Sequence, residues 1–264
     1  MESFKTHLIE LKLSPRTINT HIQKYNMLTE SGIDFNNQKQ IISFIDTQDT
    51  DSKKKTMAST ASKYLTFLNK PNNEILTYIQ QLNKALAETH LNRSKAQVEG
   101  SITFKQLTTF MNGLYETEKW REFVIIYCFV KFCCRNQDLV AEVVKPNAER
   151  EDDKNYFVVS TKQDVVMWHR NVYKTKFKYD TKITKITNKK FLHAISQLEY
   201  VLKENDNFDR VVKKITTPIG SITQSVICKI VLNANPSMNN VQKVSESRGT
   251  AITTLHSNYN GTSE

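Results

Sequence analysis

Cysteine, proline and glycine are scarce in this chain, with four, five and six copies among 264 residues. The cysteines are Cys128, Cys133, Cys134 and Cys228, and no pair of them has the C-x-x-C spacing. The six histidines are scattered along the chain. The sequence therefore predicts neither a disulfide framework nor a zinc site, and we expect a reducing, intracellular compartment and no metal or cofactor.

Long apolar runs are absent as well. The N-terminus has no apolar signal-peptide core, and no segment approaches the roughly 18 apolar residues of a membrane-spanning helix. The most apolar segment, residues 123–134, is interrupted by Lys131 and is typical of a buried helix. We therefore expect no membrane association.

Acidic residues are outnumbered, with 27 Asp and Glu against 37 Lys and Arg, which gives a net charge of +10 and a pI near 9.3. Basic residues are also concentrated between Thr161 and Lys190. This segment contains nine of them and only two acidic residues, Asp164 and Asp180. They are Lys162, Arg170, Lys174, Lys176, Lys178, Lys182, Lys185, Lys189 and Lys190. Such an excess favours a polyanionic partner, above all nucleic acid. A solvated lysine-rich surface remains the alternative.

The first ninety residues are predicted to be all-helical, because apolar residues recur at three- and four-residue spacing. We expect helices around 4–11, from Ser14-Pro15 to about Leu28, over 41–45, from about Thr56 to Leu68, and over 75–86. Ser14 is a candidate N-cap with Pro15 at the first helical position. The polar stretch 88–101 is predicted to be a linker.

A second region follows. Thr103 with Gln106 has the pattern of a capping box before a helix, and a buried helix is expected from Trp120 to Cys134. Strands are expected at 156–159, 165–168, 171–173 and 181–186, with a hairpin turn at 176–180. Helices are then expected over 191–202 and 222–231, with a loop at 233–240. Arg248 is expected at the start of a further amphipathic helix, where its planar guanidinium suits a phosphate.

Several of these segments resemble the tyrosine recombinases, which break and rejoin DNA. Leu13-Ser-Pro-Arg-Thr-Ile18 and residues 56–68 are similar to parts of the family's helical core-binding domain. Arg135 with Asp138 resembles its first arginine motif, and Tyr173-Lys174-Thr175 resembles its catalytic-lysine hairpin. Ser245-Glu-Ser-Arg248-Gly-Thr250 resembles its His-x-x-Arg motif. The matches follow the family's order as far as about His256.

The resemblance implies an α+β fold: a SAM-like helical core-binding domain over 1–90, a linker over 91–102, and a mostly helical catalytic domain with a small antiparallel sheet over 103–264. It implies metal-independent transesterification through a phosphotyrosyl intermediate. Arg135 and Arg248 would hold the phosphate and Lys174 would protonate the leaving oxygen, although Lys176 or Lys178 is an alternative for that role. Asp138 would orient Arg135 or cap a helix.

The partner implied is double-stranded DNA, with self-association on DNA and no small-molecule substrate. The expected DNA-contacting residues are Lys12, Arg16, Lys53, Lys54, Lys55, Lys176 and Lys178. A viral or other mobile-element recombinase, located wherever its target DNA lies in the cytoplasm or nucleus, is the leading interpretation. A helical scaffold with a basic surface is a third possibility, after a DNA-binding relative without catalysis.

The chain departs from the family at two points. Ser245 stands where the family has histidine, and serine is a poor proton acceptor. The family's nucleophilic tyrosine follows a further helix and a Gly-His or Gly-Trp element, whereas Tyr259 is the only tyrosine between Arg248 and Glu264. Tyr259 is thus the candidate nucleophile on an alignment that matches 248–259 to that later element. On the preferred alignment the nucleophile is missing, and we expect a truncated or degenerate recombinase.

Overall fold

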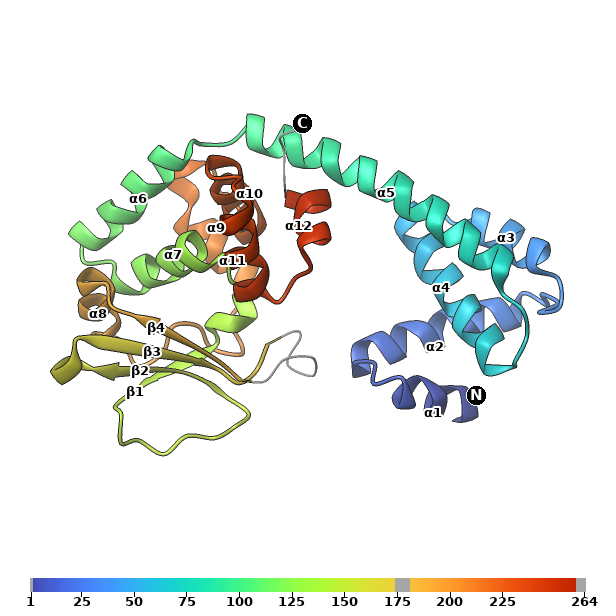
Figure 1. Cartoon of the computed structure of the whole chain (residues 1–264), viewed down its shortest axis with the longest axis horizontal. Helices are drawn as coiled ribbons and strands as arrows, with labels where there is room; N and C mark the ends of the chain where they lie inside the picture. Colours follow the sequence, from blue (N-terminus) through green and yellow to red (C-terminus); the bar gives the residue numbers. More distant parts are fainter. Residues whose placement is uncertain (1, 174–180, 260–264) are drawn as a thin grey trace. The chain divides into compact units, whose positions relative to one another are not determined.

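The protein is described here by a computed structural model that covers residues 2–173 and 181–259, with Glu2 and residues 256–259 described by their backbone alone (Figure 1). The chain divides into two compact units, Met1–His90 and Leu91–Glu264. No described helix is both long enough and apolar enough to cross a lipid bilayer.

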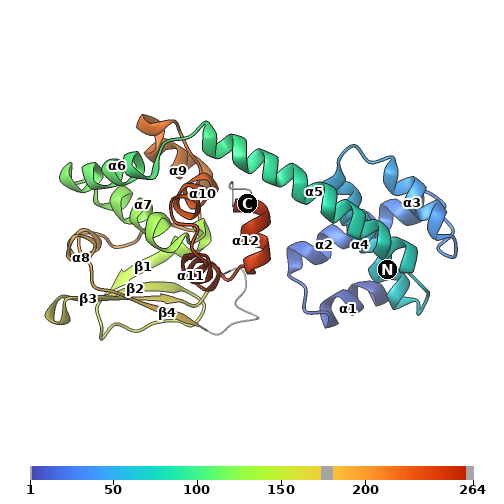
Figure 2. The same cartoon turned by 45° about the horizontal axis from the view of Figure 1, so that its top comes forward.

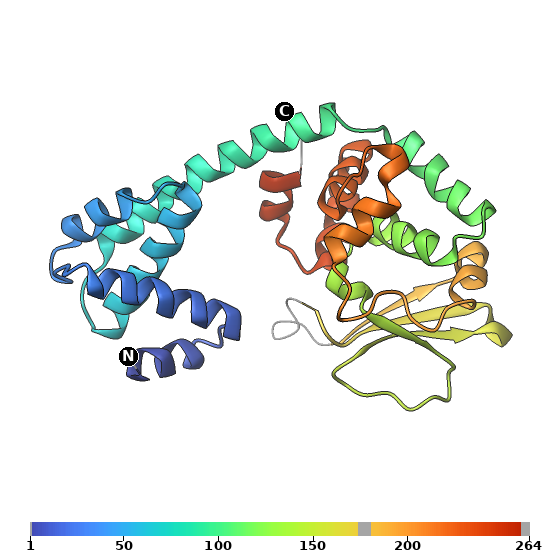
Figure 3. The same cartoon turned by 180° about the vertical axis from the view of Figure 1, so that it is seen from behind.

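The first unit is all-helical (Figure 3). It contains α1 (Glu2–Glu10), α2 (Pro15–Glu30), α3 (Gln38–Asp46), α4 (Asp51–Phe67) and the beginning of α5 (Asn73–Glu99). Ser14 caps α2 as expected, since its hydroxyl accepts the backbone N–H of Thr17 at 3.3 Å. The fourth helix begins earlier than the predicted Thr56, because Thr50 caps it by accepting the N–H of Lys53 at 3.3 Å.

The apolar residues of the predicted helices form two buried clusters. One joins Phe4, Leu8 and Ile18 and is surrounded by the partly buried rings of Tyr25 and Tyr64. The other contains Leu28, Ile41, Ile45, Met57, Ala58, Ala61, Leu65 and Ile75. The helical periodicity of apolar residues in the sequence therefore predicted which residues are buried in these two clusters.

The predicted linker is helical over most of its length, because α5 continues to Glu99. Residues 91–99 are rich in strong helix formers such as Leu, Arg, Lys, Ala, Gln and Glu. Their polarity alone does not distinguish a linker from a solvated helix. One side of this segment is nevertheless buried, since Ser94 is fully inaccessible and Gln97 accepts a hydrogen bond from the Lys229 ammonium at 2.6 Å.

The second unit opens with α6 (Phe104–Glu116) and α7 (Trp120–Phe132). The capping box is confirmed: Thr103 Oγ1 accepts the N–H of Gln106, and Gln106 Oε1 accepts the N–H of Thr103 at 2.8 Å. Helix α7 is buried along eight consecutive residues, 123–130. The predicted buried helix is therefore confirmed and lies in the core of this unit.

The sheet has four strands in the order β1-β2-β3-β4: Ala141–Val144, Asn155–Ser160, Val165–Arg170 and Lys182–Ile186. The first pair is parallel and the other two are antiparallel, so the expectation of a purely antiparallel sheet was wrong. The strand β1 was not predicted. Residues 145–154 connect the two parallel strands.

Residues 171–173 are not a strand. The Asn155 side chain occupies both backbone groups of Val172: its Oδ1 accepts the N–H at 2.7 Å and its Nδ2 donates to the carbonyl at 2.9 Å. A side chain thus satisfies the groups that a neighbouring strand would otherwise bind. The predicted turn at 176–180 lies outside the described residues.

The helix predicted over 191–202 is shorter, because α8 (Lys189–Ile195) ends after two turns. The residues beyond it are extended along β1, where Val143 N–H donates to Glu199 at 2.8 Å and Val201 N–H donates to Ala141 at 3.0 Å. The edge of β1 presents unpaired backbone groups, and this segment covers them.

The remaining elements are helical: α9 (Phe208–Ile215), the 3-10 turn η4 (Thr217–Ile219), α10 (Gln224–Ala234), α11 (Met238–Arg248) and α12 (Ile252–Tyr259). The helix α9 was not predicted, and α11 occupies part of the loop expected at 233–240. Helix α12 contacts both α10 and α11, and the three helices lie near one another in Figure 2.

Helices pack on the sheet through aromatic side chains. Phe157 of β2 and Trp168 of β3 stack with ring centroids 5.0 Å apart. Phe132 of α7 contacts Trp168, and Phe191 of α8 contacts Phe157. The α+β class is confirmed, and the ends of α7 and β3 are brought close together by this core.

Candidate functional site

Arg135 lies just beyond the C-terminus of α7, at the start of the 3-10 turn η1 (Asn136–Leu139). Asp138 caps this turn, since its Oδ2 accepts the backbone N–H of Arg135 at 3.0 Å. Asp138 is 2% exposed. Burial raises the pKa of its carboxyl, against the opposing effect of the Arg135 N–H and of the nearby arginines. Of the two roles expected for Asp138, the structure favours capping.

Arg248 is the last residue of α11, so the prediction that it begins a helix was wrong. Gly249 ends the helix in the left-handed conformation, at φ 60°, a role for which glycine carries no Cβ penalty. A cation is stabilised at a helix C-terminus by the helix dipole. The Arg248 side chain is 6% exposed and its Nη1 donates to the Cys133 carbonyl at 2.7 Å.

Arg135 and Arg248, far apart in the sequence, are in direct contact. Nη1 of Arg135 donates to the Arg248 carbonyl at 2.6 Å, and Nη2 donates to Thr250 Oγ1 at 2.8 Å. Thr250 belongs to the same sequence segment as Arg248 that resembles the second arginine motif. The two predicted arginines and this threonine therefore share one site.

Two further cations that were not assigned from the sequence join them. Nη1 of Arg170, at the end of β3, donates to the Ser247 carbonyl at 2.7 Å. The ammonium of Lys182, at the start of β4, donates to the Glu246 carbonyl. We refer to Arg135, Arg170, Lys182 and Arg248 as the cation cluster.

A sequence signal for Arg170 exists. Val166, Trp168 and Arg170 alternate along β3, and the first two are completely buried. An arginine on the buried face of a strand requires unusual compensation. Here the guanidinium lies 4.5 Å from the centre of the Trp168 ring and its Nη2 donates to Thr184 Oγ1 at 3.0 Å.

The cation cluster has an electrostatic explanation within the fold. The carbonyls in the last turn of α11 form the negative end of the helix dipole, and three cations bind those of residues 246, 247 and 248. Carbonyls carry only partial charge, however, and the carboxyl of Asp138 is the acid that acts electrostatically on all three arginines. Burial and the charge of Arg170 also lower the pKa of Lys182. The cluster is therefore strongly positive.

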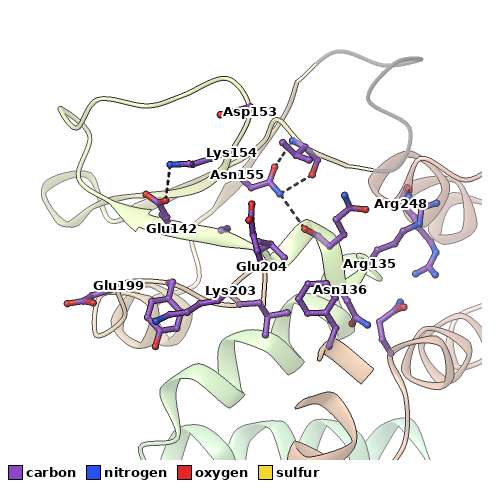
Figure 4. A pocket seen from close by; sticks show the side chains of 18 residues that line it. Arg135, Asn136, Glu142, Asp153, Lys154, Asn155, Glu199, Lys203, Glu204 and Arg248 are labelled. Carbon is purple, nitrogen blue, oxygen red and sulfur yellow. Dashed lines mark hydrogen bonds and ion pairs between the residues drawn. The ribbon is translucent and has the colours of Figure 1, made fainter. Parts of the chain in front are cut away.

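The cluster borders a cavity of about 950 Å³ to which both Arg135 and Arg248 contribute. Figure 4 shows the two arginines together on one side of this cavity, near Asn136. Glu142, which pairs with Lys154 at 3.6 Å, lies on the opposite side. Four acidic and four basic side chains line the cavity, so its positive charge is concentrated at the end where the two arginines lie.

The remaining predicted catalytic residues are placed only in part. Lys174, Lys176 and Lys178 lie outside the described residues. Tyr259 is the last residue of α12, and its side chain lies outside the described part of the structure. Ser245, at the position of the family's histidine, donates its hydroxyl hydrogen bond to the Thr250 carbonyl at 2.6 Å.

The predicted DNA-contacting residues of the first unit lie at helix starts and in a loop. Lys12 and Arg16 are exposed near the α1–α2 connection. Lys53 pairs with Asp49 at 3.0 Å, and Lys54 pairs with Asp46 at 3.3 Å. Within the described ranges 2–173 and 181–259, no three His, Cys, Asp or Glu side chains form a group that could hold a metal ion.

No family model and no curated protein matches the chain. Among solved structures, the crystal structure of XerA recombinase matches 98% of this chain and 92% of its own, with 8% sequence identity and a TM-score of 0.40. Such a score is too low to establish a shared fold, so the site is interpreted from the residues of this chain.

Proposed function

We propose that the protein is a site-specific tyrosine recombinase or integrase that acts on double-stranded DNA. The observation that carries this proposal is the contact between Arg135 and Arg248, the two arginines that the sequence motifs single out. Arg170 and Lys182 add positive charge at the same place. A phosphodiester is the anion that such a planar, bidentate set of donors suits best.

The chemistry needs no metal in this scheme. The phenolic oxygen of Tyr259 attacks the scissile phosphorus and its proton passes to solvent. The P–O5′ bond breaks, and Lys174 protonates the leaving 5′ oxygen. Negative charge develops on the non-bridging oxygens, and preorganised arginines stabilise that charge in the transition state. The phosphotyrosyl ester conserves the bond energy for rejoining, by attack of a 5′ hydroxyl that releases the tyrosine.

A second candidate function is DNA binding without cleavage. The hydrogen bond from Ser245 to Thr250 favours it, because the residue at the histidine position serves the turn after α11 instead of presenting a base. Tyr259 as nucleophile also rests on the less favoured alignment. This candidate keeps the positive site and loses only the covalent step.

Covalent trapping on a nicked duplex separates the two functions. Wild type, Tyr259→Phe and Lys131→Met would be incubated with a labelled suicide substrate and resolved under denaturing conditions. Lys131 is an exposed residue of α7 and serves as a matched control. The recombinase proposal expects an adduct with wild type and Lys131→Met only.

Each other outcome has a definite meaning. Salt-sensitive DNA binding without an adduct in any variant would support the binding protein. An adduct that survives Tyr259→Phe would assign the nucleophile to another residue. Absence of DNA binding at low salt would overturn both functions.

A further inference from the structure

Arg170 and Lys182 form an unfavourable pair within the sheet. The register of β3 and β4 places them directly opposite each other. Like charges at such positions destabilise an antiparallel pair. Arg170 is 3% exposed and forms no ion pair with a carboxylate in the part of the chain that the structure describes. Something other than strand pairing must therefore stabilise this arrangement.

Both side chains bind the same short segment. Arg170 donates to the Ser247 carbonyl and Lys182 to the Glu246 carbonyl, two consecutive residues in the last turn of α11. These carbonyls form the negative end of the helix dipole, which compensates part of the repulsion between the cations. The pair thus joins the β3–β4 hairpin to the end of α11.

The bound segment leads directly into Arg248. Ser247 precedes Arg248, and its hydroxyl donates to the Phe132 carbonyl at 2.9 Å. Arg248 in turn donates to the carbonyl of Cys133, the residue that follows Phe132 at the C-terminal end of α7. The backbone around Arg248 is therefore held from the sheet by Arg170 and Lys182, and from α7 by Phe132 and Cys133.

We propose that Arg170 and Lys182 are positioning residues that hold the C-terminal end of α11 on the β3–β4 hairpin and thereby set Arg248 for a scissile phosphate. This inference rests on the proposed function for its substrate. Its structural half, the attachment of the 246–250 segment, is independent of catalysis.

The structural half is tested by amide hydrogen exchange on the full chain. Arg170→Met and Lys182→Met each remove one contact with a carbonyl of α11. Lys185→Met is the matched control, because Lys185 is an exposed residue of the same strand β4. We expect faster exchange over residues 246–252 in the first two variants and unchanged exchange in the control. Unchanged exchange in both variants would overturn the inference.

The catalytic half is tested by single-turnover cleavage of two substrates, a normal phosphodiester and a methylphosphonate at the scissile position. The methyl group removes the charge that Arg248 faces. We expect Arg170→Met to slow cleavage of the phosphodiester by roughly 10–100-fold with little change in DNA affinity. The loss should be smaller on the methylphosphonate, and Arg248→Met should show the same pattern.

The double variant Arg170→Met/Arg248→Met should be no slower than Arg248→Met alone, because the first residue acts through the second. Arg170→Lys, which keeps the charge, should recover part of the rate. Additive losses, or equal losses on both substrates, would reduce Arg170 to a residue of general stability and overturn the inference.

Failure of a variant to fold and failure of the proposed function are distinguished from failure of this inference. If Arg170→Met does not fold, the partly exposed Lys182→Met carries the same tests. If wild type neither binds nor cleaves DNA, the proposed function fails while hydrogen exchange still decides the attachment of the segment.

Discussion

The two units hold their positive charges in opposite ways. In the first unit the Lys53–Asp49 pair is solvated, with side chains that are 55% and 68% exposed. In the second unit Arg170 and Arg248 are buried. Arg170 donates to the Ser247 carbonyl and to Thr184 Oγ1, and Arg248 donates to the Cys133 carbonyl. A solvated cation needs no partner, whereas a buried one is retained only with specific compensation.

This difference between solvated and buried cations indicates which unit holds the candidate functional site. The charges of the first unit resemble those of an ordinary solvated protein surface. In the cation cluster, Arg135, Arg170 and Lys182 donate to backbone carbonyls at the end of α11. The carboxyls of Asp138, whose pKa is raised, and of Glu246 also act electrostatically on its members. A bound phosphate would add negative charge at this cluster, so the chemical hypothesis concerns the second unit.

A buried titratable group of the first unit, His21, differs from the buried arginines of the second unit. His21 is 6% exposed, and its Nδ1 lies 2.8 Å from Thr60 Oγ1. Thr60 donates its own proton to the Thr56 carbonyl at 2.9 Å, so it accepts from a neutral His21 that carries hydrogen on Nδ1. Here a titratable group is buried by losing its charge, not by finding a counter-charge.

The largest effect is expected from Arg135→Met. It removes the donors that bind the Arg248 carbonyl and Thr250 Oγ1, and with them one arm of the phosphate site. Loss of a preorganised donor to a developing oxyanion typically costs about 10²–10³ in rate. Single-turnover cleavage measures this effect, with Lys131→Met as the control. A decrease below about threefold would contradict the assignment of Arg135 to the phosphate.

A smaller effect is expected from acid on the first unit. Burial and the charge of Lys63 lower the pKa of His21 from 6.5 to about 4. Between these values the unfolded chain takes up a proton that the folded chain does not, so stability is fully present above pH 6.5 and is lost as the pH falls. The upper limit of this loss is about 3 kcal/mol.

The His21 prediction is measured by histidine NMR titration and by urea unfolding at pH 7 and pH 4. In His21→Gln the loss of stability over this range should be smaller. The exposed His90→Gln should behave as wild type. A titration of His21 near 6.5 in the folded protein would contradict the account.

The smallest effect on stability is expected from Lys53→Gln and Lys54→Gln. Solvated ion pairs contribute about 0–1 kcal/mol, so each variant should unfold close to wild type. If these lysines contact DNA phosphates, each substitution should reduce the salt dependence of binding by about one charge. Fluorescence anisotropy over a salt series measures that slope. An unchanged slope in both variants would remove these two lysines from the DNA interface.

Local signals in the sequence predicted local structure well. Ser14 with Pro15 predicted the start of α2, and Thr103 with Gln106 predicted the capping box of α6, because each signal concerns groups within four residues of one another. The helix expected from Arg248 was misplaced because the last turn of α11 has little apolar periodicity. Gly249 marked its end more reliably than the apolar pattern marked its start.

Signals that depend on distant partners were missed. The strand β1 is short, and it is defined by pairing with β2 on one side and with residues 199–202 on the other. The loss of the strand at 171–173 depends on one side chain, Asn155, from another strand. Neither effect leaves a pattern in its own segment.

The sequence by itself determined that this is an α+β chain with a helical first unit, a positive charge excess and two arginines in suggestive motifs. It did so because periodicity, capping and charge are properties of neighbouring residues. Only the tertiary structure decided that Arg135 and Arg248 meet, and that Arg170 and Lys182 join them. The physical reason is the end of α11, whose terminal carbonyls accept hydrogen bonds from cations of three separate segments.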